Sequence, residues 1–206
     1  MNDTGGKGWA AGMEPLVLAS QSPRRAEILR AVGWRFVVRV TETDEALRAG
    51  ETPSVYVERL AQAKALAVAR DTVSDSSCQP RLVLGADTTV VVDGSILGKP
   101  RDEADARAML ERLQGRWHEV LTGVALVDAE RMQTLIAHET TRVLFGRMTA
   151  DEIKAYVATG EPADKAGAYA VQGRAALFIE RIEGDYWNVV GLPIRLVYKL
   201  AHSMES

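Results

Sequence analysis

The chain has 206 residues, of which 47% are hydrophobic and 26% are charged, so its composition fits one large folded domain and excludes a disordered chain. Its 25 Lys and Arg residues against 28 Asp and Glu residues give a formal net charge of -3, which argues against a stable nucleic-acid partner. The single cysteine excludes an internal disulfide and a cysteine-based zinc site, and three histidines without paired spacing argue against a histidine-rich metal site.

Residues 1–14 are rich in glycine and show no hydrophobic period. We expect them to form a disordered N-terminal extension, and residues 15–206 to form a single domain. The start of the chain lacks the apolar core of a secretory signal, and no apolar run reaches the roughly 18 to 20 residues that cross a bilayer. The expected location is therefore cytoplasmic, with no membrane partner.

The first half of the chain predicts two short strands and two helices. The expected elements are a strand at Leu16–Ala19, a helix at Pro23–Ala31, a strand at 36–40 and a long helix at 52–70. In the long helix Thr52 is placed to cap the N-terminus, because proline follows it at the first helical position. Residues 71–80 are polar and predict a loop.

The second half begins with the strongest strand signal, Leu82–Val92, and a hairpin turn at Asp93-Gly94. The remaining expected elements, in order, are a helix at 102–113, strands at 118–127 and 135–145, a helix at 149–159, a hairpin of strands at 177–182 and 187–190, and a helix at 193–204. Because strands alternate with helices throughout, the predicted class is α/β with a mixed sheet.

The segment from Ser20 to Arg25 is the first candidate site. The expected strand ends here, Ser22 is placed as the helix cap, and Arg24 and Arg25 fall in the first helical turn. The positive end of the helix dipole disfavours each exposed cation there by about 0.3 to 1 kcal/mol, and a bound anion would reverse that effect. The pattern therefore fits either a phosphate site or two surface arginines paired with carboxylates.

Asp87 is the second candidate, because aspartate is depleted in strands and this one interrupts a valine-rich run. A carboxylate at the end of a central strand can hold a divalent cation or accept a proton from water. The alternative is an aspartate that bonds local backbone amides.

Four further candidates are weak individually. Lys99 follows the predicted hairpin, Glu45 follows the second strand, and Lys64 lies at the margin of the apolar stripe of the long helix. Gln172 lies in a stretch of small residues and has an amide suited to reading a base edge. The alternative for Lys99 is a solvated surface lysine, and the alternative for the Gln172 stretch is a plain glycine-rich loop. The chain has no P-loop, dinucleotide-binding, nucleophile-elbow or HExxH motif.

Taken in order, these segments resemble the Maf family of nucleoside triphosphate pyrophosphatases. The matching blocks are LVLASQSPRRAEILR, LGADTTVVVDGSILGKPRDEADARAML, GRWHEVLTGVAL, YVATGEPADKAGAYAVQG and GDYWNVVGLPI, which lie between residues 16 and 200. The resemblance implies an elongated mixed sheet with flanking helices and a cleft between two lobes. That fold is similar to the one of the inosine triphosphate pyrophosphatases.

The resemblance also implies a reaction, in which a nucleoside triphosphate is hydrolysed to the monophosphate and pyrophosphate with a divalent cation, usually Mg2+. The threonine after Asp87 and the AGAYAVQG block look like the branch that acts on dTTP and UTP. The family further suggests a homodimer. Two other classes stay open: a non-catalytic nucleotide- or nucleic-acid-binding regulator of cell division, and a phosphatase acting on sugar phosphates.

Individual residues take their roles from the match. Ser20, Ser22, Arg24 and Arg25 match the phosphate-binding loop, and Asp87 matches the proton acceptor. The resemblance places Glu45, Lys64 and Lys99 in the same cleft, and we expect these three residues to be catalytic together with Asp87. On chemical grounds we expect Asp87 and Glu45 to hold the metal. The positions tied to base choice are Arg24, Thr88 and Gln172.

Overall fold

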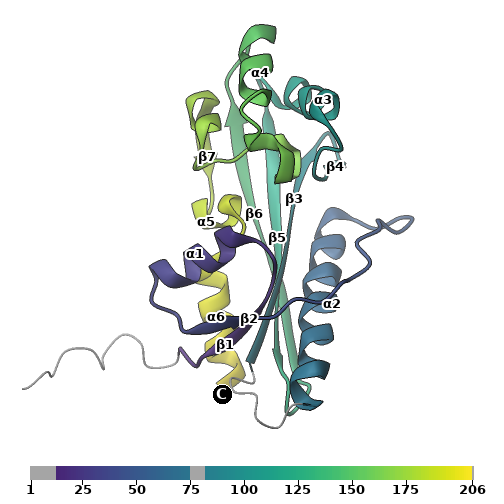
Figure 1. The fold of residues 1–206 in the computed structure, drawn as a ribbon, viewed down its shortest axis with the longest axis vertical. Helices are drawn as coiled ribbons and strands as arrows, with labels where there is room; N and C mark the ends of the chain where they lie inside the picture. The colour runs from purple at the N-terminus through teal and green to yellow at the C-terminus, as the bar shows by residue number, and fades with distance from the viewer. Residues whose placement is uncertain (1–12, 75–81, 206) are drawn as a thin grey trace, which may run out of the picture.

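The computed structural model describes residues 13–74 and 82–205. In this part of the chain seven strands form one mixed sheet in the order β2-β1-β3-β5-β6-β7, with β4 paired to β3 (Figure 1). The strands are β1 (Leu16–Ala19), β2 (Phe36–Val38), β3 (Leu82–Val92), β4 (Ser95–Leu97), β5 (Trp117–Asp128), β6 (Thr134–Phe145) and β7 (Ile179–Glu183). The pairs β1–β2 and β1–β3 are parallel and the others antiparallel, so the expected α/β class with a mixed sheet is confirmed.

Helices cover both faces of the sheet. The α-helices are α1 (Pro23–Ala31), α2 (Pro53–Ser74), α3 (Glu103–Leu113), α4 (Ala150–Val157), α5 (Tyr186–Val190) and α6 (Ile194–Glu205). Three short 3-10 helices, η1 (Glu161–Asp164), η2 (Ala166–Ala168) and η3 (Arg174–Phe178), follow α4. In Figure 1 the long strands β3, β5 and β6 connect an end that carries α1, α6 and β2 with an end that carries α3, α4 and β4.

The side chains of β1 show how the sheet separates two hydrophobic cores. Leu16 and Leu18 join the larger core, which also contains side chains of α1, α3, α4 and α6. Val17 and Ala19 point the other way and pack in a second core with Ala61 and other α2 side chains. This alternation follows from the two-residue period of a strand. Of the helices in the described part of the chain, α2 supplies the second core.

One predicted element is wrong. The expected strand at 187–190 is helix α5, which Asp185 caps by accepting a hydrogen bond from the backbone N–H of Trp187 at 2.7 Å. The helix ends at Gly191, whose φ is 125°. A run this short has no period that separates a strand from a helix, so the cap and the terminal glycine decide the outcome.

The other predicted elements are present: β1, α1 and β3 have the predicted ends, and the rest have ends shifted by one to four residues. The β3–β4 hairpin is confirmed, and both residues of its turn, Asp93 and Gly94, have positive φ, as the favoured two-residue hairpin turn requires. Helix α2 continues to Ser74, into the predicted polar loop, whereas residues 75–80 lie outside the described residues. Of residues 1–14, which we expected to be disordered, 1–12 likewise fall outside them, whereas the Glu14 carbonyl accepts a hydrogen bond from Trp34 Nε1 at 2.9 Å. No described helix is long and apolar enough to cross a membrane.

Candidate active site

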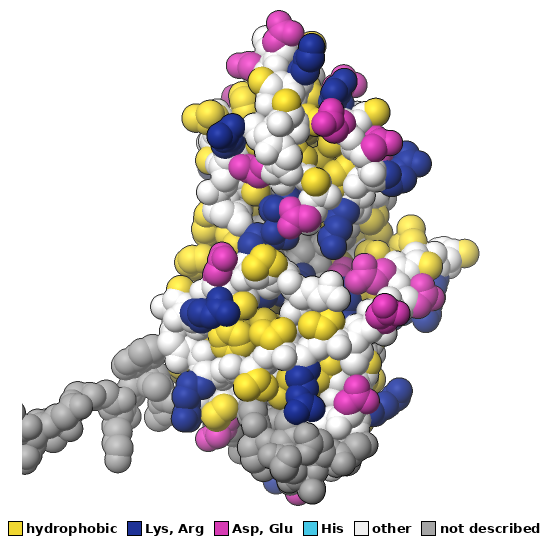
Figure 2. All heavy atoms as spheres, in the orientation of Figure 1, with side chains coloured by type: hydrophobic (Ala, Val, Ile, Leu, Met, Phe, Trp, Pro, Cys, Tyr) yellow, Lys and Arg dark blue, Asp and Glu magenta, His cyan; other side chains and the backbone are white. Residues whose placement is uncertain are grey.

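The predicted site residues all line one cleft of about 810 Å³. Figure 2 shows a hollow halfway along the molecule, with basic and acidic side chains gathered around it. The lining includes Ser20, Ser22, Arg24, Arg25, Glu45, Lys64, Asp87, Thr88, Lys99 and Gln172. The structure therefore brings together positions that lie up to 152 residues apart in the chain (172 minus 20). Their individual roles stay predictions.

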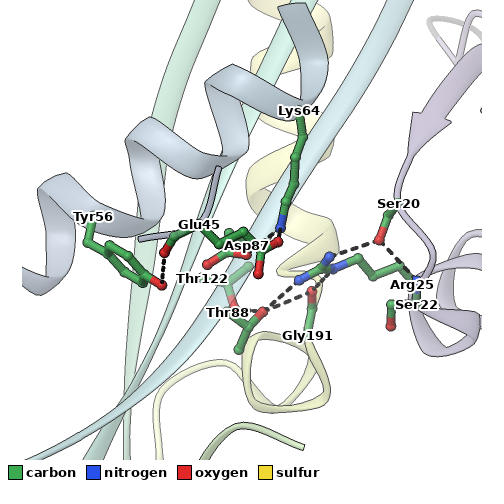
Figure 3. A network of polar contacts seen from close by, with 10 residues as sticks. All are labelled: Ser20, Ser22, Arg25, Glu45, Tyr56, Lys64, Asp87, Thr88, Thr122 and Gly191. Atoms are coloured by element: carbon green, nitrogen blue, oxygen red, sulfur yellow. Dashed lines mark hydrogen bonds and ion pairs between the residues drawn. The ribbon is translucent and has the colours of Figure 1, made fainter. Parts of the chain in front are cut away.

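The centre of the cleft holds one ammonium group between two carboxylates (Figure 3). Lys64 Nζ lies 2.7 Å from Asp87 Oδ1 and 2.6 Å from Glu45 Oε1. Asp87 lies in the middle of β3 and not at a strand end as expected, and its side chain faces α2, which carries Lys64. The unusual aspartate in a valine-rich strand is thus explained by a cation on the neighbouring helix.

Two glycines allow α2 to lie close enough for this contact. A Cβ at Gly85 would come within 2.1 Å of the Ala61 carbonyl oxygen, and a Cβ at Gly123 within 2.2 Å of the Val57 carbonyl oxygen. Gly85 precedes Asp87 by two residues on the same face of β3, and Gly123 pairs directly with Asp87 across the β3–β5 ladder. The backbone of α2 therefore rests on the sheet on both sides of the Asp87 carboxylate.

The two carboxylates have opposite pKa shifts. Burial raises the pKa of Asp87, and the charges of Lys64 and Arg25 only partly oppose it. Partial burial also acts to raise the pKa of Glu45, but the hydrogen bond and charge of Lys64 outweigh it and the net shift is downward. Neighbouring acids whose pKa values are pushed apart are typical of a site where one group exchanges a proton and the other stays ionised.

Arg25 is a buried cation held by neutral groups. Its side chain donates to the Gly191 carbonyl at 2.8 Å, to Ser20 Oγ at 2.9 Å and to Thr88 Oγ1 at 3.1 Å (Figure 3). The residue is 8% exposed, and burial lowers the pKa of its guanidinium while the Asp87 charge acts to raise it. A guanidinium that donates its hydrogen bonds to neutral oxygens keeps its charge available to an anion in the cleft.

Ser22 does not cap α1 with its side chain. Its backbone N–H instead donates to Ser20 Oγ at 3.2 Å, so the expectation of a side-chain cap is wrong. Ser20 Oγ is thereby placed between the start of α1 and the Arg25 guanidinium. Ser22 is still the N-cap residue by position, and the loop orders Arg25 through Ser20.

Arg24 follows the alternative that sequence reasoning left open for the two arginines. Its Nη1 lies 3.1 Å from Asp164 Oδ2 in an ion pair, and Asp164 also pairs with the neighbouring Lys165. Asp164 and Lys165 line the cleft, but they were given no individual role from the sequence. The DKAGAY block contains them, and only the tertiary contact with Arg24 distinguishes this charged pair from a surface one.

A second group of residues missed from the sequence holds the segment between β2 and α2. The Tyr56 hydroxyl donates to the Glu45 carbonyl at 3.1 Å, and Arg59 Nη2 donates to the Ala46 carbonyl at 3.1 Å. Arg59 also forms a two-point ion pair with Glu51 at 2.5 and 2.8 Å. Because these contacts include backbone carbonyls, whose position depends on the fold of the segment, no residue pattern predicts them.

The donor set suits a hard divalent cation. Asp87 and Glu45 supply carboxylate oxygens that already converge on one positive charge, that of Lys64. Mg2+ is typically held by one or two carboxylates together with waters and substrate phosphates. The described residues contain no group of three or more His, Cys, Asp or Glu side chains able to hold a metal, so such an ion would need the phosphates of a ligand.

The chain is similar to several known proteins. A dTTP/UTP pyrophosphatase of Symbiobacterium thermophilum is 56% identical over 183 residues, covering 88% of this chain and 90% of that protein. One of Pelotomaculum thermopropionicum is 51% identical, covering 88% and 92%. The Staphylococcus aureus Ham1 protein shares the fold, with a TM-score of 0.52 at 16% identity over 93% of this chain and 100% of that one. Since the family model described as Maf-like protein matches residues 15–204, the chain belongs to the Maf-like family.

Proposed function

We propose that the protein hydrolyses the pyrimidine nucleoside triphosphates dTTP and UTP to the monophosphate and pyrophosphate. The observation that carries this is the single cleft in which Lys64 lies between Asp87 and Glu45, with Arg25 buried beside them. Relatives that are 56% and 51% identical over most of their length bear the name dTTP/UTP pyrophosphatase, which supports the same substrate class.

The cleft offers basic side chains that can bind the phosphates of the substrate. A triphosphate carries about four negative charges near neutral pH, and phosphoryl transfer depends mainly on positioning and charge stabilisation. Arg24, Arg25, Lys64 and Lys99 supply four cationic side chains along the lining. A magnesium ion held by Asp87 and Glu45 supplies further neutralisation of phosphate charge when bound.

Asp87 is the base in this proposal. Its carboxylate accepts a proton from a water whose oxygen bonds to the α-phosphorus, while the bond from that phosphorus to the bridging oxygen of the β-phosphate breaks. Pyrophosphate leaves with the bridging oxygen. The raised pKa of Asp87 suits a group that takes a proton, and the lowered pKa of Glu45 suits one that stays ionised. Lys64 orients both carboxylates, and Arg25 faces the developing negative charge.

Base choice rests mainly on Gln172 in this proposal. The Thr88 hydroxyl is already engaged by Arg25 at 3.1 Å and Thr122 at 2.9 Å, so Thr88 acts chiefly by fixing Arg25. Gln172 is an exposed residue of the lining, and its amide can pair with the O4 and N3–H edge of thymine or uracil. Gln172→Ala should reduce the preference for dTTP over CTP by about tenfold, and an unchanged preference would remove Gln172 from this role.

Product analysis tests the function. The purified full chain is incubated with Mg2+ and each of dTTP, UTP, CTP, dATP and dGTP, and phosphate is measured with and without an added inorganic pyrophosphatase. We expect phosphate only with the coupling enzyme, and most from dTTP and UTP. Phosphate from sugar phosphates without the coupling enzyme would favour a phosphatase. Absence of turnover with every triphosphate would favour a binding regulator.

We also propose that the protein acts as a homodimer in the cytoplasm, as the family resemblance implies. Sedimentation equilibrium of the full chain tests the first part: a mass near twice 22.4 kDa is expected, and a mass near 22.4 kDa would contradict it.

A further inference from the structure

Asp164 joins two cationic side chains that come from distant parts of the chain. Its Oδ2 accepts from Arg24 Nη1 at 3.1 Å, and its Oδ1 pairs with Lys165 Nζ. Arg24 belongs to α1, at the end of the molecule that carries α6, whereas Asp164 ends η1, which follows α4. The contact therefore crosses the cleft that all three residues line.

The two cations are set into the wall of the cleft and the anion lies on its solvent side. The exposed fractions of the Arg24 and Lys165 side chains are 20% and 15%, against 60% for Asp164. The Asp164 carboxylate places one oxygen on each of the two cations. A phosphate group bridges two cationic side chains in the same arrangement. Exposed ion pairs contribute little to stability, so a ligand with several negative charges can replace this carboxylate.

The segment that carries Lys165 is held in place by contacts with neighbouring parts of the fold. The Gly167 N–H donates to the Gly98 carbonyl at 3.0 Å, which fixes the segment against the residue that precedes Lys99. Ala168 adopts a φ of 60°, a left-handed conformation rare for a residue with a side chain. The Tyr169 hydroxyl lies 2.8 Å from His118 Nε2 on β5. Lys165 and Lys99 are thus presented by two segments that are docked on each other.

We propose that Lys165, together with Arg24, forms a polyphosphate-binding position of the cleft, and that the Asp164 carboxylate occupies this position until a polyphosphate displaces it. The inference rests on the proposed function, since it names a binding residue and a competing anion for the same substrate. Asp164 keeps two cations neutralised between turnovers. A triphosphate gains its full interaction with Arg24 and Lys165 only after Asp164 has moved away.

Calorimetric titration of inorganic tripolyphosphate into the full chain, with EDTA present, measures this competition directly. Asp164→Asn keeps the shape of the side chain and removes its charge, so we expect about three- to tenfold tighter binding. Lys165→Gln should weaken binding by a similar factor. In the double variant the gain from Asp164→Asn should shrink, because the two residues share one interaction.

Asp93→Asn is the matched control. Asp93 is also exposed and paired with an arginine, Arg116, at 2.8 Å, but it does not line the cleft. The Asp93→Asn substitution changes the net charge by the same amount as Asp164→Asn and should leave tripolyphosphate binding unchanged. Equal tightening in Asp93→Asn would reduce the effect to overall charge and overturn the proposal. Unchanged or weaker binding by folded Asp164→Asn, or unchanged binding by Lys165→Gln, would also overturn it.

These outcomes are separate from those of the proposed function. If Asp164→Asn binds tripolyphosphate more tightly but the protein hydrolyses no nucleotide, the binding position stands and the function fails. If the protein hydrolyses dTTP and both variants bind tripolyphosphate as the unmodified chain does, the function stands and this inference fails.

Discussion

The two sides of the cleft are built in different ways. On the side formed by β3, α1 and α2, Asp87 and Arg25 are 9% and 8% exposed and are held by short contacts to Lys64, Ser20 and Thr88. On the other side Lys99 and Gln172 are exposed and extend from connecting segments. Groups that take part in chemistry need fixed geometry, whereas groups that select a ligand can sit on adaptable segments. In the function proposed above, bond cleavage belongs to the buried side, whereas the exposed side binds phosphate through Lys99 and selects the base through Gln172.

The largest effect is expected from the buried side. Asp87→Asn removes the proposed base, and general-base catalysis typically contributes about 10²- to 10⁴-fold, so kcat for pyrophosphate release from dTTP should fall by that factor. Asp93→Asn, outside the cleft lining, should keep its turnover. If folded Asp87→Asn turns over dTTP at the unmodified rate, the buried side does not carry the chemistry.

The second prediction concerns the close contact between Gly85 and α2 on the buried side of the cleft. Gly85→Ala places a methyl group 2.1 Å from the Ala61 carbonyl oxygen, so α2 must shift, and overpacking of this kind costs about 1–3 kcal/mol. Urea unfolding should show a loss near the upper end of that range. Gly98→Ala, where nothing lies within 4 Å of the added carbon, is the matched control and should unfold at the original urea concentration. Equal stability of Gly85→Ala and Gly98→Ala would show that α2 does not rest on the sheet as described.

The third prediction concerns His118, a buried residue that contacts the Tyr169 hydroxyl and so supports a segment on the exposed side of the cleft. Burial lowers its pKa from 6.5 to about 4. Between those pH values the unfolded chain binds a proton that the folded chain excludes, so the contribution to stability is complete above pH 6.5 and is lost as the pH falls. The free energy of unfolding should drop by about 2 kcal/mol from this group between pH 7 and pH 5.

The measurement is urea unfolding at both pH values in the unmodified chain and in His118→Gln. The drop between pH 7 and pH 5 should be smaller by that amount in the variant, which has no imidazole to titrate. The same drop in both proteins would mean that His118 is not held neutral behind Tyr169.

The smallest effect is expected for Tyr56. Tyr56→Phe removes only the hydroxyl that donates to the Glu45 carbonyl, and one hydrogen bond of this kind contributes about 1 kcal/mol. We expect a loss of a few fold in kcat/KM for dTTP, because the segment carrying Glu45 is less well held. Tyr186→Phe changes an exposed tyrosine outside the cleft lining and serves as control. Identical kinetics in the two variants would show that the Glu45 segment needs no such support.

The sequence predicted the buried side better than the exposed one. A valine-rich strand with one aspartate, and a helix with a lysine at the edge of its apolar stripe, are local patterns, and both elements are present, although Asp87 lies in the middle of its strand and not at the end. The Asp164 contact with Arg24 and the Tyr56 contact with Glu45 depend on how distant segments meet, which no local pattern encodes. Helix α5 was mistaken for a strand because five residues are too few to show a period.

The central claim is that Asp87 activates a water for attack on the α-phosphorus of a triphosphate bound in this cleft. A single turnover of dTTP in water enriched in oxygen-18, followed by mass spectrometry of both products, tests it most directly. The account predicts one labelled oxygen in the nucleoside monophosphate and none in the pyrophosphate. Label in the pyrophosphate would place the attack on the β-phosphorus and contradict the account.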